Sequence, residues 1–200
     1  MNYQQIQDAV AQYLHRDDMS VMIIIALAIA NVRIGQNLRH SSNLISAVIN
    51  VPQSPVNVPA DLRELRTLSY PAGASNPQII PIVSQDQVGQ FSNSSGGSPV
   101  YAAMTGNSLS VWPVVIGDYQ ITYYGEPAQP VLPADENPVM TALPQLYIYG
   151  ALMESFFITQ DGDLTAYARK QFGDEIQAAN IQMKQIATGT RPAMRRLYGA

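Results

Sequence analysis

The sequence predicts an α+β protein, a helical bundle formed by N- and C-terminal helices with a β-rich antiparallel insert between them. Two observations predict this class. Apolar residues recur with helical spacing near both ends of the chain, and between these regions they alternate with the period of strands. Helices and strands that are segregated along the chain are typical of α+β folds. We expect N-terminal helices in residues 1–40, the insert in 41–136, a C-terminal helical hairpin in 137–188 and a basic tail in 189–200.

The N-terminal region predicts two helices. Asn2 can cap a short helix by accepting a hydrogen bond from a free backbone N–H group. The apolar positions of this helix are Ile6, Val10, Tyr13 and Leu14. A second helix is expected over residues 19–39, and because it is apolar nearly all round we expect it to be the most buried helix. Its apolar run, residues 21–30, is shorter than the about 20 residues that span a bilayer, which favours a core helix and no membrane partner.

The central region predicts short strands. Residues 44–51 alternate as a half-buried strand, and residues 118–124 do the same. Thr105-Gly106-Asn107 lies between two alternating segments and predicts a β-hairpin. Extended segments are also expected at 65–70 and 79–83, whereas residues 56–62 predict a turn into a short helical piece. A proline-rich connection then returns the chain to its helical part.

The C-terminal region predicts two antiparallel helices within residues 144–187. Pro144 suits the first turn of a helix, where a missing N–H group has no cost. The apolar stripe of the first helix is Leu146, Gly150, Met153 and Phe157, widened by Tyr149, Leu152 and Phe156. Asp161 or Asp163 can cap the second helix. The apolar stripe of the second helix is Phe172, Ile176, Ala179, Met183 and Ile186. A connection this short makes the two helices neighbours.

The charge of the chain is low and unevenly distributed. Charged residues make up 13% of the sequence, below the usual quarter. A surface with few charges is consistent with a subunit of a permanent assembly. The net charge is −4 overall and +4 from Lys184 onward, which leaves −8 on the rest of the chain. An acidic body argues against general binding to nucleic acid, and the basic tail is expected to dock on a partner.

The tail is the candidate binding segment. It combines arginine with methionine, leucine and tyrosine, and arginine and tyrosine are typical interface anchors. A disordered terminus is the alternative reading. The candidate partner-binding residues are Arg191, Arg195, Arg196, Leu197 and Tyr198.

The sequence contains no catalytic, cofactor or metal-binding motif that we can identify. His15 and His40 each lie at a predicted helix end without a second ligand at metal spacing. Asp161-Gly162-Asp163 resembles the start of a calcium loop but lacks the later oxygen ligands, so a helix cap is favoured. No cysteine is present to form a disulfide or a thiolate metal site. We therefore expect no enzyme, no cofactor and no metal.

A second functional class remains open at this point. The predicted strands carry several aromatic residues and almost no lysine or arginine. A small enzyme or a carbohydrate-binding module would use such an aromatic sheet face as a ligand platform. This alternative predicts a pocket lined by Trp112, Tyr119 and Tyr123.

Four groups of residues match a known family in order along the chain. The first is a short helix followed by a long apolar one that ends near Arg33 and Arg39. The second is Val58-Pro59-Ala60-Asp61-Leu62-Arg63-Glu64-Leu65 before Leu68-Ser69-Tyr70-Pro71. The third is Tyr101, Gly106 and Leu109 before Trp112-Pro113, and then Tyr119-Gln120-Ile121-Thr122-Tyr123-Tyr124. The fourth is Asn137-Pro138 before Leu146-Tyr147-Ile148-Tyr149-Gly150-Ala151-Leu152, with residues 163–172 beyond.

With these motifs the chain resembles the head-to-tail adaptor (connector) proteins of tailed bacteriophages, including the group related to tail tubular protein A. The resemblance covers residues 3–186 and does not include the basic tail. It implies a structural virion protein at the head–tail interface, assembled in the host cytoplasm. Its copies would form a homo-oligomeric ring, dodecameric in expectation, that joins the portal protein to a downstream tail or nozzle protein. DNA would leave through the channel without specific recognition.

Overall fold

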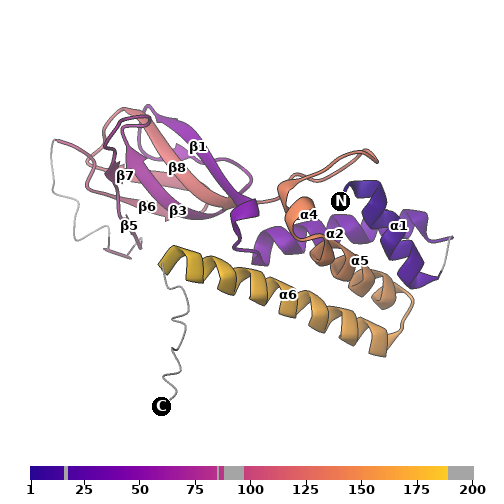
Figure 1. Ribbon diagram of the computed structural model, residues 1–200. Coiled ribbons are helices and arrows are strands. Elements are labelled where there is room, and N and C mark those ends of the chain that lie inside the picture. The colour runs from indigo at the N-terminus through magenta and orange to yellow at the C-terminus, as the bar shows by residue number, and fades with distance from the viewer. Residues whose placement is uncertain (16–17, 85, 88–96, 189–200) are drawn as a thin grey trace, which may run out of the picture. The chain divides into compact units, whose positions relative to one another are not determined.

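The computed structural model describes residues 1–15, 18–84, 86–87 and 97–188, with side chains to residue 184 (Figure 1). The predicted α+β class is confirmed. N-terminal helices come first, two four-stranded sheets follow, and C-terminal helices pack against the N-terminal ones. The chain folds into two compact units. We call them the helical unit (Met1–Asn43 and the chain from Glu126 onward) and the β unit (Leu44–Gly125).

The helical unit is built around one central helix. Its elements are α1 (Tyr3–Leu14), α2 (Ser20–Asn37), η1 (Ser41–Asn43), α4 (Pro138–Ala142), α5 (Pro144–Ile158) and α6 (Gly162–Thr188). Helix α5 contacts α1, α2, α4 and α6, and it runs antiparallel to α6 (Figure 1). The predicted C-terminal hairpin is therefore confirmed.

The helix starts follow the predicted capping chemistry. The side-chain oxygen of Asn2 accepts a hydrogen bond from the backbone N–H of Gln5 at 2.9 Å, and the Gln5 side chain accepts one from the Asn2 backbone at 3.0 Å. Asp161 accepts a hydrogen bond from the backbone N–H of Leu164 at 3.1 Å, immediately before α6 begins. Each contact satisfies an N–H group that has no partner within its own helix. The Asp161 cap is confirmed.

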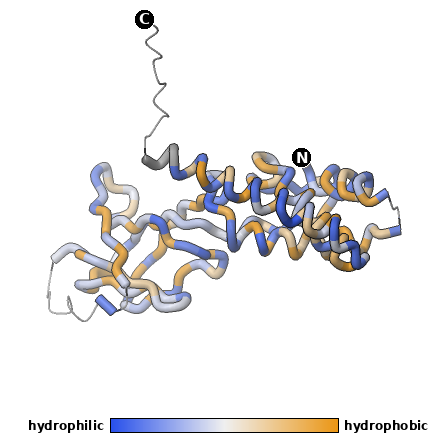
Figure 2. The backbone as a smooth tube through the Cα atoms, turned by 90° about the horizontal axis from the view of Figure 1, so that it is seen from below, coloured by the Kyte–Doolittle hydropathy of each residue, from blue (hydrophilic) through white to orange (hydrophobic). Residues whose placement is uncertain are grey.

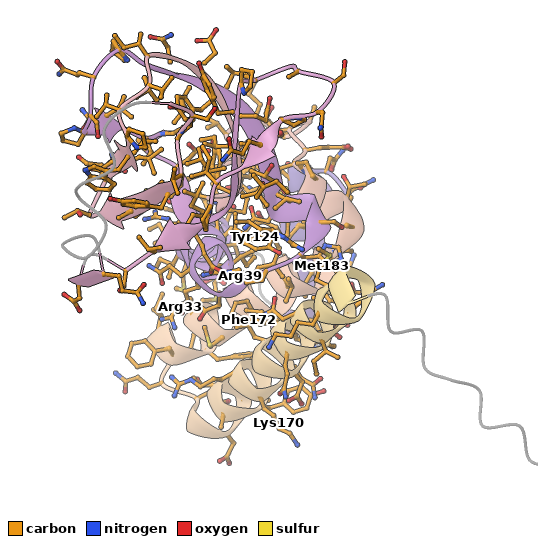
Figure 3. The ribbon with its side chains drawn as sticks, turned by 90° about the vertical axis from the view of Figure 1, so that its left-hand side faces the viewer. Arg33, Arg39, Tyr124, Lys170, Phe172 and Met183 are labelled. Carbon is orange, nitrogen blue, oxygen red and sulfur yellow. The ribbon has the colours of Figure 1, made fainter. Side chains whose placement is uncertain are left out.

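The helical core is apolar and closely packed. Its fully or nearly buried members are Tyr3, Ile6, Val10, Ile23, Ala26, Leu27, Ile34, Leu38, Val139, Met140, Leu146, Tyr147, Ala151, Leu152, Met153, Ala168, Phe172 and Ala179. On α6, Phe172 packs in this core and Met183 is also buried, whereas Lys170 is exposed (Figure 3). The predicted stripe of α6 is confirmed as far as Met183, and beyond Lys184 only the backbone is described.

Two sequence-based expectations about helix burial are wrong. Helix α2 is not the most buried helix, because Val21 and Ile25 are 70% and 51% exposed while most of α5 is buried. Phe157 was expected in the α5 core stripe but is 67% exposed, and Tyr147 is fully buried in the same helix. Apolar residues cover almost the whole circumference of both helices, so their spacing does not identify the packed side.

The β unit contains two sheets with a shared core. One sheet has the strand order β1-β8-β3-β4 and the other has β2-β7-β6-β5. Their bounds are β1 Leu44–Val51, β2 Val56–Asn57, β3 Leu62–Tyr70, β4 Gln78–Ile79, β5 Ile82–Val83, β6 Tyr101–Thr105, β7 Ser108–Trp112 and β8 Gly117–Gly125. The predicted hairpin is β6–β7, and β8 is the predicted later strand. All pairs are antiparallel except β5 with β6.

The short helical piece expected near residues 56–62 is wrong. After the turn, residues from Leu62 onward form β3, which pairs with β8 through two register shifts. Leu68 on β3 is fully buried with Ile121 and Tyr119 from β8. Burial of these side chains between the two sheets outweighs a weak local helical preference.

Candidate interaction surfaces

The clearest unpartnered surface of the helical unit lies on α2. Steps of three and four residues return to one side of a helix, and the residues on that side are exposed. They are Val21, Ile25, Ile29 and Val32, and we call them the α2 stripe. The stripe is about 16 Å long at 1.5 Å per residue. Figure 2 shows hydrophobic residues along the helices of this unit. The opposite side of α2 packs into the core with α5.

One charged residue occurs in α2, and it is paired. Arg33 Nη2 lies 2.8 Å from Glu154 Oε1 on α5, and the Arg33 side chain remains 45% exposed (Figure 3). Glu154 is buried, so the pair is half-buried, and Arg33 compensates the carboxylate charge there. Because Glu154 compensates the charge of Arg33, the α2 stripe has no uncompensated charge from its own helix beside it. The surface therefore suits an apolar partner.

A buried polar network fixes α2 against α5 and the proline-rich connection. The Tyr147 hydroxyl donates to Asn31 Oδ1 at 2.6 Å and accepts from Asn137 Nδ2 at 2.9 Å. Asn31 Nδ2 also donates to the Pro127 carbonyl at 2.9 Å. Burial raises the pKa of the Tyr147 hydroxyl far above its usual value. The network is structural, because its polar atoms bond to one another in a buried site.

This network was not predicted from the sequence. Its available signal was Asn31, a lone amide among aliphatic residues in α2. A buried side-chain amide requires hydrogen-bond partners. Those partners lie about a hundred positions away in the chain, so the sequence alone does not identify them.

A shallow hollow of about 580 Å³ lies at the turn between α5 and α6. It is lined by Phe157, Ile158, Gln160, Asp161, Gly162, Thr165, Ala166 and Arg169. The Asp161 carboxylate is already engaged by the start of α6. The hollow therefore offers apolar contact area and no nucleophile paired with a base.

The predicted aromatic ligand platform does not form. Tyr119 and Tyr123 are 0% and 3% exposed in the core between the two sheets. The Tyr119 hydroxyl donates to the Val115 carbonyl at 2.8 Å, and the Tyr123 hydroxyl donates to Asp61. Burial is the main cause that raises the pKa of each phenol to about 12. A ligand cannot reach both rings together with Trp112, so the expected pocket is wrong.

Trp112 and the histidines have local partners. The Trp112 ring stacks on Tyr101 with ring centroids 5.4 Å apart. Exposed His15 ends α1 in the left-handed conformation, with φ of 49°. His40 Nδ1 lies 2.9 Å from Ser42 Oγ, and burial lowers the pKa of its imidazole. Within the described ranges, no group of three or more histidine, aspartate or glutamate side chains is arranged to hold a metal ion.

Helix α2 is also long and apolar enough to cross a membrane by length and composition. That test is passed equally by core helices of soluble proteins. Here Ile23, Leu27 and Ile34 pack in the helical core, so one side of the helix is already occupied by protein.

The candidate tail residues Arg191, Arg195, Arg196, Leu197 and Tyr198 lie outside the described residues. The last described element before them is α6, which ends at Thr188.

Comparison with known proteins gives one finding for the whole chain. A family model described as SU10 adaptor protein matches residues 1–196. The search of curated proteins found no match. Because the family match spans both the helical unit and the β unit, it applies to the complete α+β arrangement.

Proposed function

The chain belongs to the SU10 adaptor protein family, a family of phage head-to-tail adaptors, and on this premise we propose that its copies form a ring that joins the portal to the tail. The resemblance noted in the sequence is confirmed by this membership, and the protein is a structural adaptor, not an enzyme. The proposed ring is dodecameric and prolongs the channel through which DNA leaves the head. The chain would be a virion component at the head–tail interface.

The observation that carries the ring proposal is the α2 stripe. Its four aliphatic side chains are exposed on a helix whose other side is packed. Contiguous exposed apolar residues on a soluble protein mark contact surfaces, because burying them against a partner removes them from water. A ring of like-oriented subunits needs a heterologous contact between two different surfaces of each subunit. The stripe supplies one of these two surfaces.

The charge distribution fits a DNA channel. The chain up to residue 183 carries a net charge of −8. Nucleic-acid affinity comes largely from lysine and arginine that displace counterions from phosphates. An acidic channel wall lets DNA pass without holding it, so we expect no sequence-specific DNA recognition.

The portal contact is assigned to the tail after Gly189. Its candidate residues Arg191, Arg195, Arg196, Leu197 and Tyr198 combine positive charge with apolar and aromatic area. Such a segment suits an acidic groove on the portal protein. The remaining partner in this proposal is a downstream tail or nozzle protein.

The test is mass photometry of the full chain over a concentration range, alone and with the portal protein of the same phage. A discrete species near twelve subunits, or stepwise loading of the portal to that number, is expected. A monomer that does not load the portal at any concentration would contradict the proposal.

A pair of variants tests the stripe. Ile25→Asp places a carboxylate in the α2 stripe and is expected to abolish ring formation. Ile181→Asp is the matched control, because Ile181 is 45% exposed on α6 and is not part of the stripe. Equal loss of rings in both variants would indicate a general effect of charge and not a contact on α2.

A further inference from the structure

The four sheet edges of the β unit are unequal. Three of them are strands of two residues each: β2, β4 and β5. Prolines adjoin all three, at Pro55 before β2, Pro77 before β4 and Pro81 before β5. Short edge strands and prolines are devices that prevent another chain from adding to a sheet. The β unit therefore protects three edges against strand addition. On the β4 side, the part of β3 that β4 leaves uncovered carries charged residues and two register shifts, which are protections of the same kind.

The fourth edge, β1, has none of these protections. It is eight residues long and pairs with β8 in continuous register from Leu44 opposite Tyr124 to Val51 opposite Gly117. It contains no proline, no charged residue and no bulge. Ser46, Val48 and Asn50 point to the solvent face of the sheet and are exposed, Val48 by 57%.

The free side of β1 presents a row of backbone groups. In an antiparallel ladder, every second residue directs its N–H and C=O groups away from the paired strand. Among the strands that the structure describes, β8 is the one that pairs with β1. The side-chain contacts of the strand also go to β8: Asn50 donates to Asp118 at 2.7 Å and Ser46 accepts from Gln120 at 2.8 Å. None of these contacts covers the outer row.

We propose that β1 accepts an extended segment of a neighbouring virion protein as an added strand, an inference that rests on the proposed adaptor function. The chemistry of the edge selects this occupant. A row of alternating backbone donors and acceptors is satisfied by an extended polypeptide. Because β1 carries no charge, the added segment is expected to be uncharged, with small polar and aliphatic side chains beside Ser46 and Val48.

A second copy of the chain is the weaker occupant. Two β1 strands can pair antiparallel about Val48, which would place Ser46 opposite Asn50 of the other copy. That contact has two-fold symmetry, and two-fold contacts do not generate a ring of like-oriented subunits. A head-to-tail contact would require a second long strand open to addition. The candidate is β3, of which β4 covers only Ser69 and Tyr70, but the rest of β3 carries Arg63, Glu64 and Arg66 and two register shifts, which disfavour strand addition. The segment therefore comes from another protein.

Hydrogen–deuterium exchange on the full chain tests the proposal directly. The probes are the purified portal protein and the purified first tail protein of the same phage, each added separately. With the correct partner, we expect the exposed half of the backbone amides in residues 44–51 to exchange about tenfold more slowly, because they gain hydrogen bonds. A contact made only by side chains would leave these amides unchanged.

Two lysine variants distinguish binding at the β1 edge from binding elsewhere on the same face of the sheet. Val48→Lys places an ammonium group on the edge strand, and lysine there discourages strand addition. Thr67→Lys places the same group on β3, a strand of the same sheet that β8 separates from β1, at an exposed position. We expect Val48→Lys to weaken partner binding about tenfold and Thr67→Lys to leave it unchanged, with both variants melting like the wild type.

Each other outcome overturns the proposal in a recognisable way. If a partner binds while exchange in residues 44–51 stays the same, strand addition is wrong and the adaptor function stands. If neither virion protein binds, both proposals fail. Protection of residues 44–51 that grows with concentration of the chain alone identifies pairing between two copies and overturns the assignment to another protein.

Discussion

The hydroxyl of Tyr147 on α5 donates a 2.6 Å hydrogen bond to Asn31 on α2, in a region from which water is excluded. The same hydroxyl accepts from Asn137, which in turn caps α4 by accepting from the Met140 N–H at 2.8 Å. One phenol therefore connects α2, α5 and the start of α4. Helix α2 carries the α2 stripe, so the orientation of the stripe within the helical unit depends on this connection.

Replacing Tyr147 with phenylalanine is expected to destabilise the protein by about 1–3 kcal/mol, because Asn31 Oδ1 loses its donor in a buried site. Urea denaturation followed by circular dichroism measures the effect. The control is Tyr13→Phe, since Tyr13 is 60% exposed on α1 and should tolerate the change within error. Equal stability of Tyr147→Phe and wild type would show that the hydrogen bonds contribute nothing net.

Gly150 permits the close approach of α5 to α2. A Cβ atom at this position would lie 2.8 Å from the Cβ of Ala30 and 3.2 Å from the Phe172 ring. We expect Gly150→Ala to destabilise the protein by about 1–3 kcal/mol, less the helix-propensity gain of up to about 1 kcal/mol.

Gly173→Ala on α6 is the matched comparison. Nothing lies within 4 Å of the added Cβ at Gly173, so only the propensity gain remains and a stabilisation of up to about 1 kcal/mol is expected. Thermal melts of the two variants against the wild type test the opposite signs. If both variants were stabilised, α2 and α5 would be less closely packed than the structure indicates.

The sequence predicted most of the helices and long strands but not which helix faces are packed. Periodicity located α2 and α5, yet Val21 and Phe157 are exposed while Tyr147 is buried. The reason is physical: when apolar residues surround a helix, the packed side is decided by neighbours that are distant in sequence. Leu62 shows the same limit, because its strand forms through pairing with β8, about sixty positions away.

The candidate surfaces were also only partly predictable. Composition identified the tail, but residues 191–198 lie outside the described residues. The exposed edge of β1 depends on strand order, and alternation in residues 44–51 gives no information on whether a strand lies inside a sheet or at its border. The expected aromatic platform is wrong for a similar reason. Alternation places Tyr119 and Tyr123 on one face of a strand, but it does not tell whether that face packs in a core or is open to a ligand.

Alkaline pH is expected to destabilise the β unit. The pKa of Tyr123 is raised to about 12 by burial and by the neighbouring Asp61 carboxylate, and an unfolded tyrosine titrates near 10. Because the folded state disfavours the phenolate, the stabilisation is full below about pH 10 and is lost as the pH rises toward about 12. Tyr119, whose pKa is also about 12, adds to the same effect.

Fluorescence of Trp112 measures this loss, since Trp112 is the single tryptophan and lies in the β unit. Melting temperatures recorded from pH 9 to 12 should fall, and the fall should be shallower in Tyr123→Phe, which has no phenol to ionise. An equally steep fall in that variant would assign the alkaline sensitivity to other groups.

Deletion of the chain after Gly189 is expected to leave the fold intact and to weaken docking on the portal. The removed residues include Arg191, Arg195 and Arg196, and no residue of either described core. The melting temperature should therefore stay the same, while occupancy of portal rings in mass photometry should fall. A full-length variant with these three arginines changed to serine separates charge from chain length. If charge carries the contact, the variant should dock as poorly as the truncation, and wild-type docking should weaken with rising salt.

Wild-type occupancy by the truncated chain would show that the portal contact lies elsewhere on the subunit.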